Sequence, residues 1–157
     1  MTDWNSLHAQ VVTEFTRAWS MPGPGAFDAI LDDDVELVQP MLRDTIGRDN
    51  WDQEILRLQT AMPNLTGEVL AWAGSGDSIF VNLRLVSTQK GKTFDFTLID
   101  HIRISPEGMI VRRDSYFDSA PLARNMVTRP TWWLPWWKSG AAPLAARRKL
   151  PGFGVLH

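Results

Sequence analysis

The hydrophobic periodicity of this chain changes near Leu65, and that change limits the folds open to it. Before this point apolar residues recur at steps of three and four, which predicts amphipathic helices over residues 3–20 and 48–62 and a strand at 35–39 between them. After it, four apolar segments are separated by glycine-containing turns. These segments predict strands at 65–73, 78–88, 93–104 and 109–118. The pattern indicates an α+β fold, with helices packed on one face of a curved antiparallel sheet.

Composition narrows the possibilities further. The 157 residues, 44% of them hydrophobic, suit one domain that buries roughly two thirds of its unfolded surface. The sequence has no cysteine, which excludes disulfides, thiolate nucleophiles and cysteine-ligated zinc. We see neither a signal-peptide pattern nor a run of the roughly 20 apolar residues that a spanning helix needs, so a cytoplasmic location is expected. A net charge of −2 argues against a nucleic-acid partner.

Asp100 is the residue that most suggests chemistry. It lies in the middle of the predicted strand 93–104, where alternation places it on the same face as Phe96, Leu98 and Ile102. A carboxyl group moved from water into an apolar setting tends to stay protonated, so that it can donate a hydrogen bond or a proton. His101 follows directly, but alternation points it to the opposite face, where a surface or interface role is expected.

A structural role for Asp100 is the alternative. The carboxyl group would then be bonded to Tyr116 on the next strand, or to an arginine such as Arg84 or Arg112. The pattern alone leaves open whether Asp100 faces a cavity or such a partner. The three histidines form no cluster with metal-ligand spacing, so neither a metal nor another cofactor is expected.

The segment from Phe94 to Phe117 reads FDFTLIDHIRISPEGMIVRRDSYF and resembles the last hairpin of the ketosteroid isomerase branch of the NTF2-like, or SnoaL-like, superfamily. The order of elements is also similar, over about residues 4–120. The resemblance implies a cone-shaped NTF2-like domain at 1–120, whose mouth opens between sheet and helices, with an extension at 121–157. It also implies that an aspartic acid at the place of Asp100 stays protonated and forms part of an oxyanion hole.

The remaining isomerase residues are replaced. VVTEFTRAW resembles the family's first helix, which puts Phe15 where the family has its oxyanion-hole tyrosine. VELVQP resembles the strand that carries the catalytic base, which puts Gln39 in place of the proton-shuttling aspartate. Because phenylalanine cannot donate a hydrogen bond and glutamine cannot accept a proton at neutral pH, genuine ketosteroid isomerase activity is not expected.

Two hypotheses of function follow. The first is a SnoaL-like enzyme for acid–base chemistry of the cyclase, isomerase or lyase type, acting on a hydrophobic carbonyl-bearing substrate such as a polyketide, terpenoid or steroid-like compound. Asp100 would be the acid or base and Gln39 an orienting hydrogen-bond partner. The other ligand-binding candidates are aromatic: Phe15, Trp19, Trp51, Phe96, Tyr116 and Phe117. For Tyr116 the resemblance implies the outer face of the sheet, since it puts Phe117 in the cavity.

The second hypothesis is a ligand-binding or assembly module of the same fold without chemistry. A lesser alternative is an epoxide-hydrolase-like enzyme, for which Arg84, Asp100 and Asp114 would have to meet, although their spacing does not match that family. For all three, the relatives imply a homodimer formed through the outer face of the sheet.

The tail holds a tryptophan-rich run, Trp132–Trp137, which contains half of the eight tryptophans. Two tryptophan pairs around Pro135 do not predict a regular helix, and exposing all four would create a large apolar patch. Packing on the domain or on a neighbouring subunit is the favoured role. A lid over the pocket and contact with a membrane surface are the alternatives, the last because basic residues follow the run.

Overall fold

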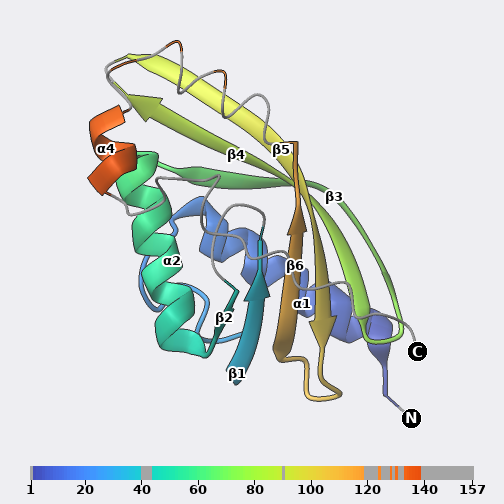
Figure 1. Ribbon diagram of the computed structural model, residues 1–157. Helices are drawn as coiled ribbons and strands as arrows, with labels where there is room; N and C mark the ends of the chain where they lie inside the picture. The colour runs from blue at the N-terminus through green and yellow to red at the C-terminus, as the bar shows by residue number, and fades with distance from the viewer. Residues whose placement is uncertain are drawn as a thin grey trace, which may run out of the picture.

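The fold is built on a six-stranded curved sheet with helices against one face (Figure 1). The computed structural model describes residues 2–39, 44–89, 91–118, 124, 128, 130 and 133–138. The elements in chain order are α1 (Trp4–Ser20), β1 (Leu31–Val38), β2 (Thr45–Ile46), α2 (Arg48–Ala61), β3 (Thr66–Ser75), β4 (Ser78–Gln89), β5 (Lys92–Ile104), β6 (Ile110–Tyr116) and α4 (Trp133–Lys138). The predicted helices and the predicted strands are all present, with shifted ends.

The sheet is mixed, which corrects the antiparallel sheet expected from the sequence. Its strand order is β2-β1-β6-β5-β4-β3. Strands β3 to β6 form the predicted antiparallel meander. The first long strand, β1, lies parallel to the last, β6. Hydrophobic patterning reports which residues of a strand are buried but not which strand it joins or in which direction, so the parallel pair could not be foreseen.

A bulge in β6 sets which of its residues point inward. Ile104 pairs with Ile110 and Arg103 pairs with Arg112, which leaves Val111 without an opposite residue on β5. One extra residue reverses the alternation of everything that follows it. Beyond the bulge, Arg113 is buried, whereas its neighbour Arg112 is only partly buried.

Helix α1 lies across the concave face of the sheet, and two glycines of β3 let it approach closely. A Cβ atom on Gly67 would lie 2.9 Å from Cβ of Trp19, and a Cβ atom on Gly74 would overlap the ring of His8. The His8 ring is buried, and its Nε2 lies 2.8 Å from the carbonyl oxygen of Gly76 at the β3–β4 turn. The helix is therefore anchored along β3 at both of its ends.

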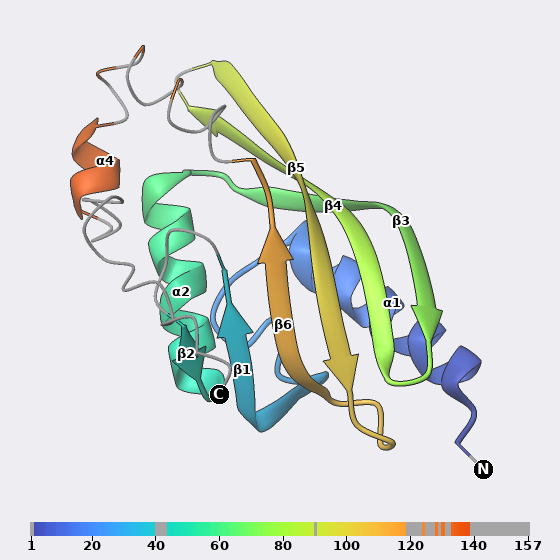
Figure 2. The ribbon, with the colours of Figure 1, turned by 45° about the vertical axis from the view of Figure 1, so that its right-hand side comes forward.

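An aromatic cluster joins α1 and α2 over the concave face. Phe15 and Trp19 of α1, Phe27 of the following loop and Trp51 of α2 are fully buried. Their ring centroids are spaced by 5.4 to 6.2 Å. The views in Figures 1 and 2 agree that none of the described helices covers the opposite, outer face of β4, β5 and β6.

Part of the tryptophan-rich run forms a short helix, which corrects the prediction that it would not. Helix α4 lies beside α2. Pro135 falls within its first turn, where a backbone N–H would have no partner inside the helix, so the proline is tolerated there. Trp133 and Trp137 are 55% and 74% exposed. Trp132 and most of the extension lie outside the described residues, and its proposed roles stay predictions.

Candidate functional site

Asp100 lies on the concave face, as its place in the strand predicted, and has no exposed surface. It pairs across the sheet with Ser115 of β6, whose Oγ donates a hydrogen bond of 2.6 Å to Asp100 Oδ1. Arg113 Nη2 lies 2.8 Å from the other oxygen, Oδ2. The contact is ionic but not a well-aligned hydrogen bond, because Oδ2 has no hydrogen-bond partner.

Arg113 connects this carboxylate to the aromatic cluster. Its side chain is 3% exposed, and its Cζ lies 5.7 Å from the ring centroid of Phe15, 5.3 Å from that of Trp19 and 5.4 Å from that of Trp51. Rings at such distances attract a guanidinium through their electron-rich faces, and the attraction is strongest where water is excluded. The polar centre of the domain is therefore an Asp100–Arg113 ion pair inside an aromatic chamber.

The groups that face Asp100 are donors. A hydroxyl group donates to one of its oxygens and a guanidinium faces the other, and both interactions require the carboxylate to act as an acceptor. The partners suggested from the sequence, namely Tyr116, Arg84 and Arg112, are wrong. Arg113 was not among the predicted partners, because regular alternation from Ile110 would bury Arg112. Alternation from Phe117, which the resemblance put in the cavity, would have placed Arg113 on the face of Asp100. The RRDS segment at residues 112–115 carried a second signal. All four residues are polar, so whichever face of the strand is buried must bury polar side chains.

Several predicted ligand-binding residues do come together with Asp100. Phe15, Trp19 and Trp51 surround its partner Arg113. Gln39 is buried and follows Val38, which pairs with Asp114, the residue before Ser115.

Phe96 and Phe117 lie farther along the same face. Both are half-buried, with ring centroids 5.6 Å apart. On the concave face of β5, Phe96 is only partly buried, whereas Phe94, Leu98 and Asp100 are buried, so the chamber is least covered at Phe96.

Tyr116 is not part of this chamber. It pairs with Ile99, which points away from Asp100, and is 58% exposed on the outer face, as the resemblance implied. Asp114 and Arg84 also lie outside the chamber, so the three residues of the epoxide-hydrolase alternative do not meet. Arg84 Nε instead lies 2.9 Å from Asp95 Oδ2.

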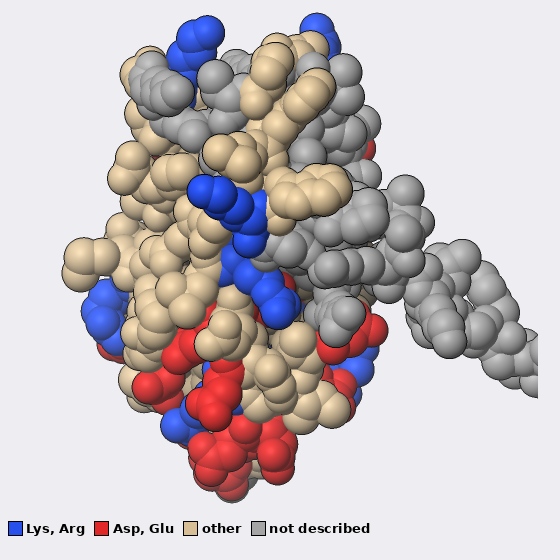
Figure 3. Space-filling model, turned by 60° about the vertical axis from the view of Figure 1, so that its left-hand side comes forward, with Lys and Arg blue, Asp and Glu red and all other residues tan. Residues whose placement is uncertain are grey.

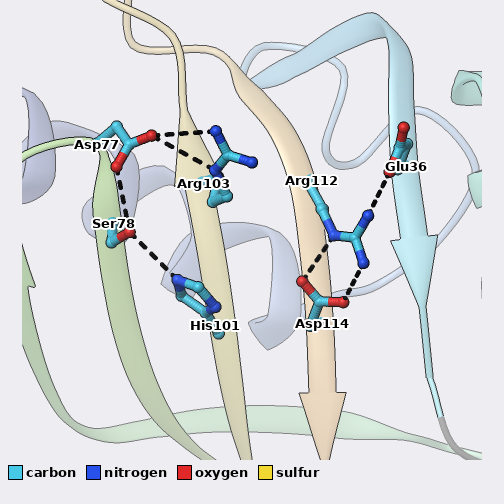
Figure 4. A network of polar contacts seen from close by, with 7 residues as sticks. All are labelled: Glu36, Asp77, Ser78, His101, Arg103, Arg112 and Asp114. Atoms are coloured by element: carbon cyan, nitrogen blue, oxygen red, sulfur yellow. Dashed lines mark hydrogen bonds and ion pairs between the residues drawn. The ribbon is translucent and has the colours of Figure 1, made fainter. Parts of the chain in front are cut away.

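The outer face carries its own polar network (Figure 4). Arg112 binds both oxygens of Asp114, at 2.8 and 2.9 Å, and lies 2.6 Å from Glu36 on β1. The hydrogen bonds to Asp114 hold the pKa of Arg112 above its ordinary value, with Glu36 adding to the effect. His101 stacks on Phe80, with ring centroids 4.5 Å apart, which agrees with the surface or interface role predicted for it.

An open hollow lies elsewhere on the surface, away from Asp100 and Arg113. Its volume is about 400 Å³, and it is lined by Asp44, Thr45, Ile46, Asn50, Gln53, Glu54 and Arg57. Acidic side chains gather near it, at the end of the molecule where β1 and α2 begin (Figure 3). No group of three or more potential metal ligands occurs within the described part of the chain. Among the described helices, none has the length and apolarity needed to cross a membrane.

Comparison with known proteins decides the family. A model of the SnoaL-like domain matches residues 12–113, well over half of the chain. The chain belongs to the SnoaL-like domain family. No curated protein matches the sequence.

Solved structures show the same fold for this SnoaL-like chain. A protein with a ketosteroid isomerase-like fold from Catenulispora acidiphila, in complex with trimethylamine, is 19% identical, with a TM-score of 0.65 over 73% of this chain and 90% of its own. An NTF2-like protein from Burkholderia pseudomallei is 21% identical, with a TM-score of 0.67 over 75% and 95%. A putative SnoaL-like polyketide cyclase from Jannaschia is 16% identical, with a TM-score of 0.63 over 76% and 92%. The NTF2-like cone predicted from the sequence is therefore confirmed.

Proposed function

We propose that this SnoaL-like protein is a small-molecule enzyme that performs acid–base chemistry on a hydrophobic, carbonyl-bearing substrate such as a polyketide, terpenoid or steroid-like compound. The observation that carries the proposal is the Asp100–Arg113 pair, buried in an aromatic chamber on the concave face. The similarity to a putative polyketide cyclase supports the same substrate class.

The energetics of the pair favour a functional role over a purely structural one. Buried ion pairs lose much of their attraction to desolvation, and well-packed apolar residues often stabilise a core equally well. Here the hydrogen bonding is also incomplete, because neither Asp100 Oδ2 nor Arg113 Nε has a hydrogen-bond partner. Buried groups left in this state call for an explanation other than stability.

In the proposed reaction, Asp100 acts first as a base. It removes a proton from the carbon next to the substrate carbonyl and later returns it at the new bonding position. The aromatic walls hold the apolar body of the substrate, and Gln39 orients its oxygen. The substrate enters from the Phe96 side, and side chains must move to admit it because Asp100 has no exposed surface.

Deuterium uptake from D₂O into 2-tetralone, a hydrophobic bicyclic ketone with an acidic carbon, tests this proposal without the natural substrate. NMR of the ketone should show faster exchange with the wild-type protein than with buffer. Asp100→Asn should remove roughly 10²-fold or more of that acceleration. Asp95→Asn, on the outer face of the same strand, is the matched control and should retain it. Equal exchange in wild type and Asp100→Asn would exclude Asp100 as the base.

A non-catalytic ligand-binding or assembly module is the second candidate. It is favoured by one specific observation: both oxygens of Asp100 already face groups of the same protein, and Asp100 has no exposed surface. Native mass spectrometry of freshly purified protein shows whether a small molecule stays bound. Together with the exchange experiment, this result distinguishes the enzyme from the module. A retained small molecule together with no exchange above buffer would favour the module.

The expected homodimer also stays a proposal, and the outer face supports it. Phe80, Ile99 and Tyr116 are 50%, 40% and 58% exposed there. The same face carries three ion pairs: Arg84–Asp95, Arg103–Asp77 and Arg112–Glu36. An apolar centre with a polar rim suits an interface between two copies related by a two-fold axis. Phe80→Arg should convert a dimer to a monomer in light scattering, whereas Thr93→Arg, at the far end of β5 from the apolar centre, should not. A wild-type monomer would exclude the dimer.

A further inference from the structure

The chamber contains more hydrogen-bond donors than its own residues can satisfy. Four buried nitrogen atoms around it have no partner: Trp19 Nε1, Trp51 Nε1, Gln39 Nε2 and Arg113 Nε. All four carry N–H groups, and indole and guanidinium nitrogens can only donate. One buried acceptor near them, Asp100 Oδ2, also has no hydrogen-bond partner. A matching ligand must therefore bring acceptor oxygens to this part of the chamber.

These donors belong to one neighbourhood. The rings of Trp19 and Trp51 both lie within 5.4 Å of Arg113 Cζ, measured to their centroids. Gln39 extends β1 beside β6, one position after the pairing of Val38 with Asp114. Arg113 is thus in contact with the two indole rings on one side and with Asp100 on the other.

The charges of Asp100, Arg113 and the substrate oxygen during proton transfer indicate a role for Arg113. If Asp100 takes a proton from a neutral ketone, the C–H bond breaks, the proton moves to Asp100 Oδ2 and the electron pair moves onto the carbonyl oxygen as an enolate. Asp100 becomes neutral at the moment when the substrate oxygen becomes negative. The guanidinium of Arg113 then loses its partner on the protein and gains one on the substrate, so the net charge of the closed chamber is unchanged.

We infer that Arg113 is a second catalytic residue, which pairs with Asp100 at rest and with the enolate oxygen during the reaction, while the N–H groups of Trp19 and Trp51 complete the oxyanion site. The inference rests on the proposed function and adds to it the residues that would stabilise the enolate. Donors that are already in position where charge develops stabilise a transition state without reorganisation of solvent.

Binding of 4-nitrophenolate, a stable oxygen anion whose ionised form alone is yellow, tests the site separately from turnover. The key comparison is between Asp100→Asn and the double variant Asp100→Asn/Arg113→Met, at a pH where the free probe is ionised. Both variants lack the base, so neither result depends on catalysis. The single variant should bind the phenolate at least tenfold more tightly than the double variant. Circular dichroism establishes that both variants are folded.

Three further measurements sharpen the test. Trp19→Phe and Trp51→Phe, each made in the Asp100→Asn protein, keep an aromatic ring but remove the N–H, and each should weaken phenolate binding severalfold. Arg103→Met, which removes an exposed arginine of the outer face, should leave it unchanged. At a pH where the free probe is the neutral phenol, the wild-type protein should turn it yellow, because Asp100 takes the proton.

Equal phenolate affinity with and without Arg113 would overturn the inference, as would the absence of any binding to the folded Asp100→Asn protein. Binding of the probe to wild type only as the neutral phenol would also overturn it. These results leave the proposed function intact if ketone exchange still depends on Asp100. If the wild-type protein does not accelerate ketone exchange above buffer but phenolate binding depends on Arg113, the site binds anions and the enzyme proposal is contradicted.

Discussion

Arg113 Nη2 lies 2.8 Å from Asp100 Oδ2, and neither side chain exposes more than 3% of its surface. Two opposite charges are thereby removed from water on neighbouring strands, β6 and β5. The pair gives the domain a polar centre whose members depend on each other energetically. Changing one member alone should have a different effect from changing both.

Arg113→Met should destabilise the protein by roughly 3–5 kcal/mol, because it leaves the Asp100 carboxylate buried without an opposite charge. Urea unfolding followed by circular dichroism measures the loss. The double variant Asp100→Asn/Arg113→Met should lose less than Arg113→Met alone. Arg103→Met, which breaks a half-exposed ion pair with Asp77, should change stability by at most about 1 kcal/mol. An equal loss for both arginines would contradict the buried pair as described.

Deletion of Val111 should be tolerated better than insertion of a residue beside it. Without Val111, Arg112 would follow Ile110 in regular alternation, so Arg113 would keep facing Asp100. An alanine inserted between Arg112 and Arg113 would instead turn Arg113 away from Asp100, and it should abolish cooperative thermal unfolding, whereas the deletion should retain it. Equal thermal unfolding of the two variants would contradict this register of β6.

Gly74→Ala should weaken the contact between α1 and β3. The added methyl group would overlap the buried ring of His8 and push the helix from the strand. A loss of roughly 1–3 kcal/mol is expected, as for other overpacked sites, and thermal unfolding measures it. Gly23→Ala is the matched control, since nothing lies within 4 Å of the position of its Cβ. His8→Ala combined with Gly74→Ala should recover part of the loss if overlap is the cause.

Asp3 should contribute to the acid sensitivity of the fold. It caps α1 by accepting hydrogen bonds from the Ser6 hydroxyl and backbone N–H, at 2.7 and 3.2 Å. The hydroxyl bond first, and then the backbone bond, lower the pKa of Asp3 in the folded state. Because the folded pKa lies below the unfolded one, this stabilisation is present above the unfolded pKa and disappears as the pH falls through the folded pKa.

Asp3→Asn, which can still cap a helix but does not titrate, should therefore flatten the dependence of stability on pH in the acid range. Denaturant unfolding at neutral and acidic pH measures this dependence. Asp3→Ala should in addition lose stability at neutral pH. An unchanged acid slope in Asp3→Asn would exclude the cap as a source of the pH dependence.

The sequence was a good guide to the elements and a partial guide to the site. The four-residue spacing of Phe15 and Trp19 identified the buried face of α1, and strand alternation identified Asp100 as buried. Both signals depend only on residues close together in the sequence. Gln39, Trp51 and the half-buried Phe96 and Phe117 also lie on the concave side as expected. What failed was partner choice: Asp100 is bonded to Ser115 and Arg113 and not to Tyr116, Arg84 or Arg112.

The sequence by itself determined the helix and strand segments and the buried position of Asp100. Only the tertiary structure decided that β1 lies parallel to β6 and that Arg113 is the charged partner of Asp100. The physical reason is that periodicity describes one strand at a time. Pairing direction and a one-residue bulge depend on what lies opposite, and they determine which charges are buried together.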